Sequence, residues 1–174
     1  MINHKTKKIF LALSCWLLIC NVCNAQNELL AKSRVAKQRD IIGTWKMTYQ
    51  TVSPLFKDKS LFFANHQIFQ FFEDGYVKNI SSKKRLAPEK VSHLLQSMPK
   101  SNMYGVVDNG MLIIERSKHD LDVIAISIAI DDFKKALRSA ASVLKKGDLI
   151  VSYRDPNQNL YMQRYLRRLT INPN

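Results

Sequence analysis

Hydrophobic and polar residues alternate with a period of two along much of the chain, the pattern of strands that bury one face. In the segment 45–52, Trp45, Met47 and Tyr49 fall on one side, and the residues between them are polar. In the segment 121–130, isoleucines share one side and small residues share the other. We expect both segments to be strands, the second buried and closely approached on its small side by a helix or a ligand.

Short turns join the other strands into hairpins. The pairs Asp74-Gly75 and Asn109-Gly110 each separate two β-rich runs, and glycine accepts the positive φ that a two-residue hairpin turn requires. A longer polar connection separates two further runs near the end of the chain. Three hairpins are therefore predicted: 66–73 with 76–80, 104–107 with 111–116, and 148–153 with 160–166.

Two segments interrupt the β pattern and predict helical inserts. The segment 88–98 has Pro88 in its first turn and is stopped by Pro99, both typical helix boundaries. The segment 131–144 starts with two aspartates and is followed by two lysines, which suits the helix dipole. The predicted fold class is therefore mainly β and antiparallel, as one domain over 41–170 with two short helical inserts.

The N-terminal segment 1–25 has the composition of a secretory signal peptide. A basic start precedes a charge-free apolar run over 9–20, and Ala25 offers a small residue for cleavage. The run is shorter than the roughly 20 residues that a transmembrane helix needs. We expect cleavage after Ala25 and export to the periplasm or the extracellular space. An uncleaved anchoring helix, or lipid attachment at Cys20 or Cys23, is the alternative.

Cleavage would change the chemistry and the charge of the mature chain, which would begin with a helical or flexible arm over 26–40. All three cysteines lie within 1–25, so no thiol would remain for a disulfide, a nucleophile or a metal. Removal of Lys5, Lys7 and Lys8 lowers the net charge from +13 to +10. No transmembrane span is expected in the mature chain. Its charge favours an anionic envelope surface as partner over nucleic acid, and an ordinary basic surface is the alternative.

Gly43-Thr44-Trp45, at the start of the first long strand, resembles the Gly-X-Trp motif of lipocalins and lipocalin-like bacterial domains. The spacing of the strands and turns that follow is similar as well. The resemblance implies an antiparallel barrel in which an arginine of the last strand stacks on the motif tryptophan. Arg164 or Arg167 is the expected partner of Trp45. The middle Thr-Asp-Tyr motif of the family is absent, so a strongly curved sheet is the alternative to a closed barrel.

An eight-stranded barrel is either filled by side chains or holds one small ligand. Aromatic residues are concentrated between positions 62 and 72 and in the first strand. The expected ligand-binding residues are Trp45, Tyr49, Phe69 and Phe71, with Arg164 pointing inward to meet an anionic head group. The alternative is that the same aromatic side chains form a filled core.

Little in the chain predicts catalysis, and we expect no catalytic residue, metal or cofactor. Ser92 and His93 are neighbours in sequence, but a nucleophile and its base are recognised by geometry and not by adjacency. His119 lies beside Asp120 and near Asp122, and a solvated turn is a simpler interpretation of this cluster than a cation site, which needs several convergent ligands.

The sequence therefore predicts a non-enzymatic binding protein for a small apolar or amphipathic ligand held in a β-barrel. The alternative is an envelope interaction or assembly protein with a filled core. Such a protein would bind an anionic partner or a membrane surface through a basic face that includes Lys83, Lys84 and Arg85.

Overall fold

The computed structural model describes residues 31–53, 66–100, 102–118, 120–134, 143–154 and 160–170, so the predicted signal peptide lies outside the described residues. The helices of this part are α2 (Gln38–Ile41) and α3 (Pro88–Ser97). Its strands are β1 (Ser33–Val35), β2 (Gly43–Val52), β3 (His66–Phe71), β4 (Tyr76–Ser82), β5 (Asn102–Val107), β6 (Met111–Ser117), β7 (Asp120–Ala129), β8 (Phe133–Lys134), β9 (Val143–Leu144), β10 (Leu149–Arg154) and β11 (Leu160–Arg168).

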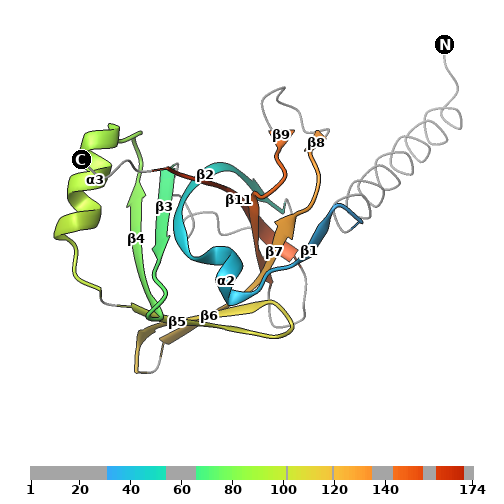
Figure 1. Ribbon diagram of the computed structural model, residues 1–174, viewed down its shortest axis with the longest axis horizontal. Helices are drawn as coiled ribbons and strands as arrows, with labels where there is room; N and C mark the ends of the chain where they lie inside the picture. The colour runs from blue at the N-terminus through green and yellow to red at the C-terminus, as the bar shows by residue number, and fades with distance from the viewer. Residues whose placement is uncertain are drawn as a thin grey trace, which may run out of the picture.

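Eight strands form a closed antiparallel barrel (Figure 1). They are hydrogen-bonded in the order β7, β10, β11, β2, β3, β4, β5 and β6, and β6 pairs with β7 to close the ring. The short strand β1 lies beside β7 just beyond the end of β6, with Val35 opposite Ser127. The mainly β antiparallel fold is thus confirmed, in its closed form.

The three predicted hairpins are confirmed by the strand pairing of β3 with β4, β5 with β6, and β10 with β11. Gly110 shows why the second turn needs glycine, because its φ is +75°. A Cβ atom at Gly110 would also lie 2.6 Å from Cγ1 of Val35. The turn therefore lets β1 pass directly against the end of the hairpin.

The helix predicted over 88–98 is confirmed as α3, but the one predicted over 131–144 is absent at both of its ends. There, β8 and β9 pair antiparallel, with Phe133 opposite Leu144. The intervening residues 135–142 lie outside the described part of the chain. The other short helix of the described chain is α2, whose first three residues belong to the segment 26–40 predicted as an arm.

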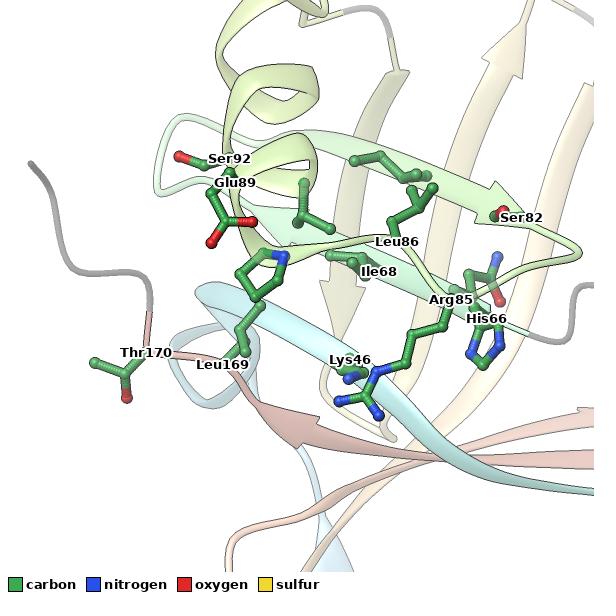
Figure 2. Close-up of a pocket in the computed structure, with 14 residues that line it drawn as sticks. Lys46, His66, Ile68, Ser82, Arg85, Leu86, Glu89, Ser92, Leu169 and Thr170 are labelled. Atoms are coloured by element: carbon green, nitrogen blue, oxygen red, sulfur yellow. The ribbon is translucent and has the colours of Figure 1, made fainter.

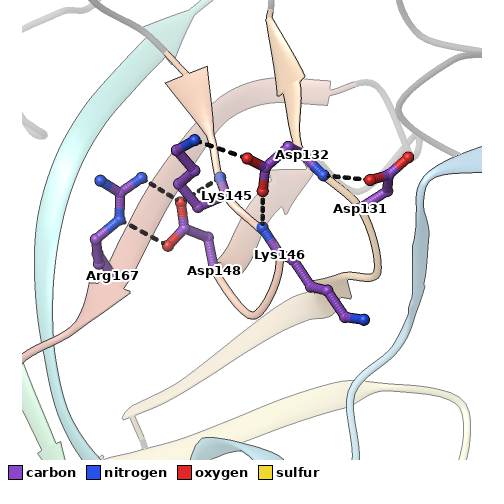
Figure 3. A network of polar contacts seen from close by, with 6 residues as sticks. All are labelled: Asp131, Asp132, Lys145, Lys146, Asp148 and Arg167. Atoms are coloured by element: carbon purple, nitrogen blue, oxygen red, sulfur yellow. Dashed lines mark hydrogen bonds and ion pairs between the residues drawn. The ribbon is translucent and has the colours of Figure 1, made fainter.

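The charges that suggested a helix dipole instead pair at the base of the β8–β9 hairpin. The Asp132 carboxylate accepts hydrogen bonds from Lys145 Nζ at 2.7 Å and from Lys146 N at 2.8 Å (Figure 3). Acids before a segment and lysines after it can compensate a helix dipole. They can equally pair with each other when the segment folds back on itself, which explains why the prediction was wrong.

Asp148 joins this hairpin to the barrel. Its carboxylate accepts a hydrogen bond from Lys145 N at 2.8 Å and two from Arg167, at 3.0 Å and 2.7 Å (Figure 3). The Asp148 side chain is only 4% exposed, so the bidentate arginine compensates a carboxylate that would otherwise be costly to bury.

One apolar cluster fills the barrel interior. It consists of residues at alternate positions of the barrel strands together with Ala36 and Ile41, which enter from one end. The strand members are Trp45, Met47, Phe69, Phe71, Val77, Tyr104, Leu112, Ile114, Ile124, Ile126, Ile128, Leu149, Val151 and Leu166. The segment before β2 therefore acts as a plug at one end of the barrel.

Trp45 and Arg168 hold this plug in place. The indole Nε1 of Trp45 donates a hydrogen bond to the carbonyl oxygen of Ile41 at 2.6 Å. Arg168 donates to the carbonyl oxygens of Asp40 and Ile42, at 3.1 Å and 2.9 Å. The two side chains thus satisfy the carbonyl groups that the end of α2 leaves without helical partners.

Arg168 also stacks on the indole, with its guanidinium carbon 4.6 Å from the ring centroid. The expectation that Arg164 or Arg167 takes this position is wrong, because the register of β11 on β2 places Arg168 opposite Trp45. Gly43 has a φ of +119°, and a Cβ atom there would lie 2.8 Å from Arg168 Nη1. The glycine of the Gly-X-Trp motif therefore makes room for the arginine.

We expect the substitution Arg168→Met to lower the free energy of unfolding by about 1–3 kcal/mol, because it removes two charge-assisted hydrogen bonds and a cation–π contact. Urea titration measures the loss. Arg116→Met is the matched control, since Arg116 forms an exposed ion pair with Asp122 and should cost less than about 1 kcal/mol. Equal losses in the two variants would contradict a special role for Arg168.

The pKa of Asp40 predicts how the plug responds to pH. The carboxylate accepts two hydrogen bonds from Arg34, at 2.7 Å and 2.8 Å, and one from Lys37 N. The Arg34 guanidinium, foremost, lowers the pKa of Asp40 to about 2. A lowered pKa stabilises the folded state above pH ~4, and this stability is lost as the pH falls towards ~2.

We therefore expect Asp40→Asn to cost about 1–2 kcal/mol at pH 7, allowing for solvent screening of Arg34. The difference from the wild type should shrink between pH ~4 and pH ~2, as measured by urea titrations over that range. A difference that stays constant down to pH ~2 would show that the ionised carboxylate is not what stabilises the plug.

Candidate functional site

The structure brings three of the five predicted ligand-binding residues together inside the barrel. Trp45 and Phe71 are only 1% and 2% exposed. Phe69 stacks on Phe71 at 5.8 Å between ring centroids, and Tyr104 meets Phe71 edge-on at 5.0 Å. Side chains so inaccessible to solvent pack against one another, as in a filled core. Their role in ligand binding stays a prediction.

Tyr49 lies in a different cluster. An irregularity in the pairing of β2 with β11 sets Met47 opposite Leu166 but Tyr49 opposite Tyr165. Tyr49 therefore leaves the interior face and stacks on Tyr165, at 5.9 Å between ring centroids. Burial raises the pKa of Tyr165 to about 12, so this phenol stays protonated and donates to Gln163 Oε1.

Arg164 is buried and belongs to a polar layer that follows the apolar core. It donates hydrogen bonds to Gln50 Oε1 at 3.0 Å, to Gln67 Oε1 at 2.5 Å and to the Tyr153 hydroxyl at 3.1 Å. Gln67 in turn donates to Asn79 Oδ1 at 3.1 Å. Arg164 thus lies in the same barrel as Trp45 but in a separate, polar layer, and its contact with a head group stays a prediction.

We expect Phe71→Ala to lower the free energy of unfolding by about 3–5 kcal/mol, because it leaves a cavity in a filled core. The neighbouring Phe72 points outward, where its ring lies 4.4 Å from Lys100 Nζ. Phe72→Ala is the matched control and should cost less than half as much. Urea titration compares the two, and similar losses would contradict the core role of Phe71.

A groove lies on the outside of the barrel, over β2, β3 and β4. Cross-strand pairing arranges the outward side chains in two rows: Thr44, Gln70 and Lys78 form a polar row, and Lys46, Ile68 and Ile80 form the next. The helix α3 covers part of this face through Val91 and Leu95, which pack on the two isoleucines. Burial of this small apolar cluster fixes α3 to the barrel.

The groove has a volume of about 260 Å³ and lies between α3, the three strands and the C-terminal segment 169–170 (Figure 2). Its apolar lining comprises Ile68, Ile80, Leu86, Pro88, Val91 and Leu169. Three basic side chains, Lys46, His66 and Arg85, line one end, and Figure 2 shows Arg85 reaching from the loop before α3 towards Lys46. Glu89 and Ser92 of α3 lie towards the other end (Figure 2).

Two hollows adjoin the groove and extend it along the barrel. One shares Lys46, His66 and Arg85 with the groove and adds Arg167 and Arg168 to its lining. The other shares Ser92, Leu169 and Thr170 with the groove and also contains the polar row of Thr44, Gln70 and Lys78. Among the described residues, neither hollow has an acidic residue in its lining. The groove is therefore apolar in its middle, basic residues line both adjoining hollows, and Glu89 is the acidic residue among the described lining of the groove.

The prediction from sequence did not include this groove, although one signal pointed to it. Ile68 and Ile80 face away from the barrel on adjacent strands, and the predicted helix over 88–98 follows the second strand closely. An apolar pair on the outer face of a barrel needs a cover, and the helix was the nearest candidate.

The described residues contain no group of His, Cys, Asp or Glu side chains that could hold a metal ion. His119 lies outside the described part of the chain. No described helix is both long and apolar enough to cross a membrane.

The fold belongs to the class of closed eight-stranded antiparallel β-barrels, and it is compatible with a lipocalin-like barrel. Comparison with protein-family models, with curated proteins and with solved structures found no match to this chain.

Proposed function

We infer that this chain is an exported, non-enzymatic binding protein that holds a small apolar or amphipathic molecule in the groove beneath α3. The observation that carries this function is an apolar groove floor, formed around Ile68 and Ile80, with basic side chains at one end and the polar Glu89 and Ser92 towards the other. Ligand pockets combine an apolar lining with a few polar groups that orient the ligand. The groove and its two adjoining hollows have this composition.

The filled interior favours a site outside the barrel. Trp45 and Phe71 are inaccessible, so a molecule bound between them would have to separate packed aromatic side chains. The groove already offers about 260 Å³ on the surface. Binding there leaves the core intact, and it therefore requires less rearrangement than binding in the interior.

The groove also favours binding over catalysis. His66, Glu89 and Ser92 all line it, and these are residue types of a hydrolytic triad. In the described structure no hydrogen bond joins any two of them, whereas a nucleophile and its base lie within hydrogen-bond distance in a working triad. These side chains therefore serve best as polar contacts for a bound molecule.

A basic face is the second candidate for function. Lys83, Lys84 and Arg85 are exposed in the loop between β4 and α3, at the edge of the groove. With the net charge of +10 that cleavage after Ala25 would leave, this loop supports docking to an anionic envelope surface. Such docking would weaken steeply as salt rises, whereas insertion of an uncharged molecule into the groove would not.

The groove can be tested with N-phenyl-1-naphthylamine, an uncharged apolar dye whose fluorescence rises on binding. We expect Ser92→Trp to weaken dye binding about tenfold or more, because the larger side chain fills the groove. His93→Trp is the matched control, since His93 is the next residue of α3, is exposed and does not line the groove. Fluorescence titration of the purified protein gives both dissociation constants.

Unchanged dye binding in the Ser92 variant would contradict the groove and direct attention back to the barrel interior. Absence of dye binding to the wild type would contradict the proposed function as a whole.

A further inference from the structure

A buried ammonium group lies at one margin of the groove. Lys78 is only 8% exposed, and the hydrogen bond of its Nζ atom is to the Leu95 carbonyl oxygen, at 2.5 Å. The Phe72 ring centroid lies 5.5 Å from the same atom. None of the ion pairs among the described residues includes Lys78. An ammonium group has three donors, and burying it without a negative partner is costly.

The surroundings of Lys78 are rich in hydrogen-bond donors. Lys78, Gln70 and Thr44 stand side by side on β4, β3 and β2. Ser92 and Gln96 of α3 face the same hollow, which has a volume of about 620 Å³ and also includes Arg168 and Thr170. Within the described part of the chain, the side chains of Gln70, Ser92 and Gln96 make no hydrogen bond to another residue. These groups are therefore available to a bound molecule.

Arg168 adds a second positive charge to this hollow. Its guanidinium is held by two carbonyl oxygens and by the ring of Trp45, all of them uncharged groups. No acidic side chain of the described residues lines the hollow. Two fixed cations therefore border a space without a carboxylate, and such a space favours an anion.

We propose that this hollow is an oxyanion subsite, which takes the carboxylate, phosphate or sulfonate group of the molecule whose apolar part lies in the groove. Ser92, Leu169 and Thr170 line both spaces, so one molecule can occupy the two together. Lys78 and Arg168 supply the charge, and the amides and hydroxyls around them complete the hydrogen bonds. The assignment rests on the proposed function for the apolar part of the ligand.

A purely structural role is the competing explanation for Lys78. Its bond to Leu95 caps the C-terminal end of α3, where a positive charge is favourable. A lysine that only anchors α3 would affect apolar and anionic ligands alike. A lysine that also binds the oxyanion would affect anionic ligands selectively, and this difference decides between the two roles.

The test compares two dyes that share an apolar skeleton, uncharged N-phenyl-1-naphthylamine and 1-anilinonaphthalene-8-sulfonate, which carries a sulfonate. In the wild type the sulfonate dye should bind more tightly. Lys78→Met should reduce the affinity for the sulfonate dye about tenfold or more and leave that for the uncharged dye within about twofold. Lys78→Arg, which keeps the charge and the donors, should restore the selectivity.

Two matched controls locate the effect. Lys100 also contacts the Phe72 ring, at 4.4 Å, but is exposed, pairs with Asp74 and does not line the hollow, so Lys100→Met should change neither affinity. Arg85 lies at the opposite end of the groove. Loss of selectivity in Arg85→Gln, with none in Lys78→Met, would overturn the assignment to the hollow around Lys78.

Competition then identifies the source of the oxyanion. Inorganic phosphate that displaces only the sulfonate dye at constant ionic strength supports a subsite that accepts a free or terminal phosphate. Decanoate that displaces both dyes supports a carboxylate head group attached to an apolar chain. Competition by neither would overturn the subsite.

The dyes also separate this inference from the function on which it rests. Equal loss of both dyes in Lys78→Met, with a lower thermal unfolding midpoint, would assign Lys78 to anchoring α3 and overturn the subsite. Equal binding of the two dyes by the wild type would overturn the subsite and leave the groove in place. Failure of both dyes to bind the wild type would remove the proposed function itself.

Discussion

The barrel depends on the way in which Trp45 and Arg168 close one of its ends. Between them they satisfy the carbonyl groups of three successive residues, Asp40 to Ile42, at the end of α2. The Ile41 carbonyl group is buried, and leaving it without a partner would be costly, so these two side chains stabilise the plug in the barrel. Arg168 comes from the last strand, β11, and Trp45 comes from the first long strand, β2. Their contact therefore also joins the first and last strands of the barrel in sequence order.

The filled core that results from this closure determines where function can reside. Aromatic and branched side chains occupy the interior up to the polar layer around Arg164. A close-packed interior resists insertion of a ligand, because any new volume must displace packed side chains. The outer face of β2, β3 and β4 has no such constraint. It is covered only in part by α3, and the uncovered part is where apolar and basic side chains meet.

The charge pairs around residues 131–148 show that the same order of acidic and basic residues is compatible with a helix and with a hairpin. Asp132 and the lysines after residue 144 have the signs that stabilise a helix, yet they meet directly at the base of a hairpin (Figure 3). Asp148 continues the pattern by binding Arg167 of the last strand. Long-range pairing of this kind depends on which segments the barrel brings together, and local charge order carries no information about it.

The sequence by itself determined the eight strands of the barrel, the hairpin turns and α3, because these follow from local patterns. Alternation with a period of two marked the buried faces, the turn of Gly110 needed a positive φ, and Pro88 and Pro99 bounded the helix. The Gly-X-Trp motif, with Gly43 two positions before Trp45, was also readable, and it correctly indicated an arginine partner for the tryptophan. Local signals of this kind act over a few residues and need no knowledge of the rest of the chain.

Only the tertiary structure decided which arginine meets Trp45, on which face Tyr49 lies and where the groove forms. The register of β11 on β2 selects Arg168, and the irregularity in the same pairing turns Tyr49 away from the core. The groove joins side chains from Lys46 to Thr170, which are distant in sequence and adjacent only because the barrel closes. Register and closure are set by the packing of all eight strands together, and no single segment contains that information.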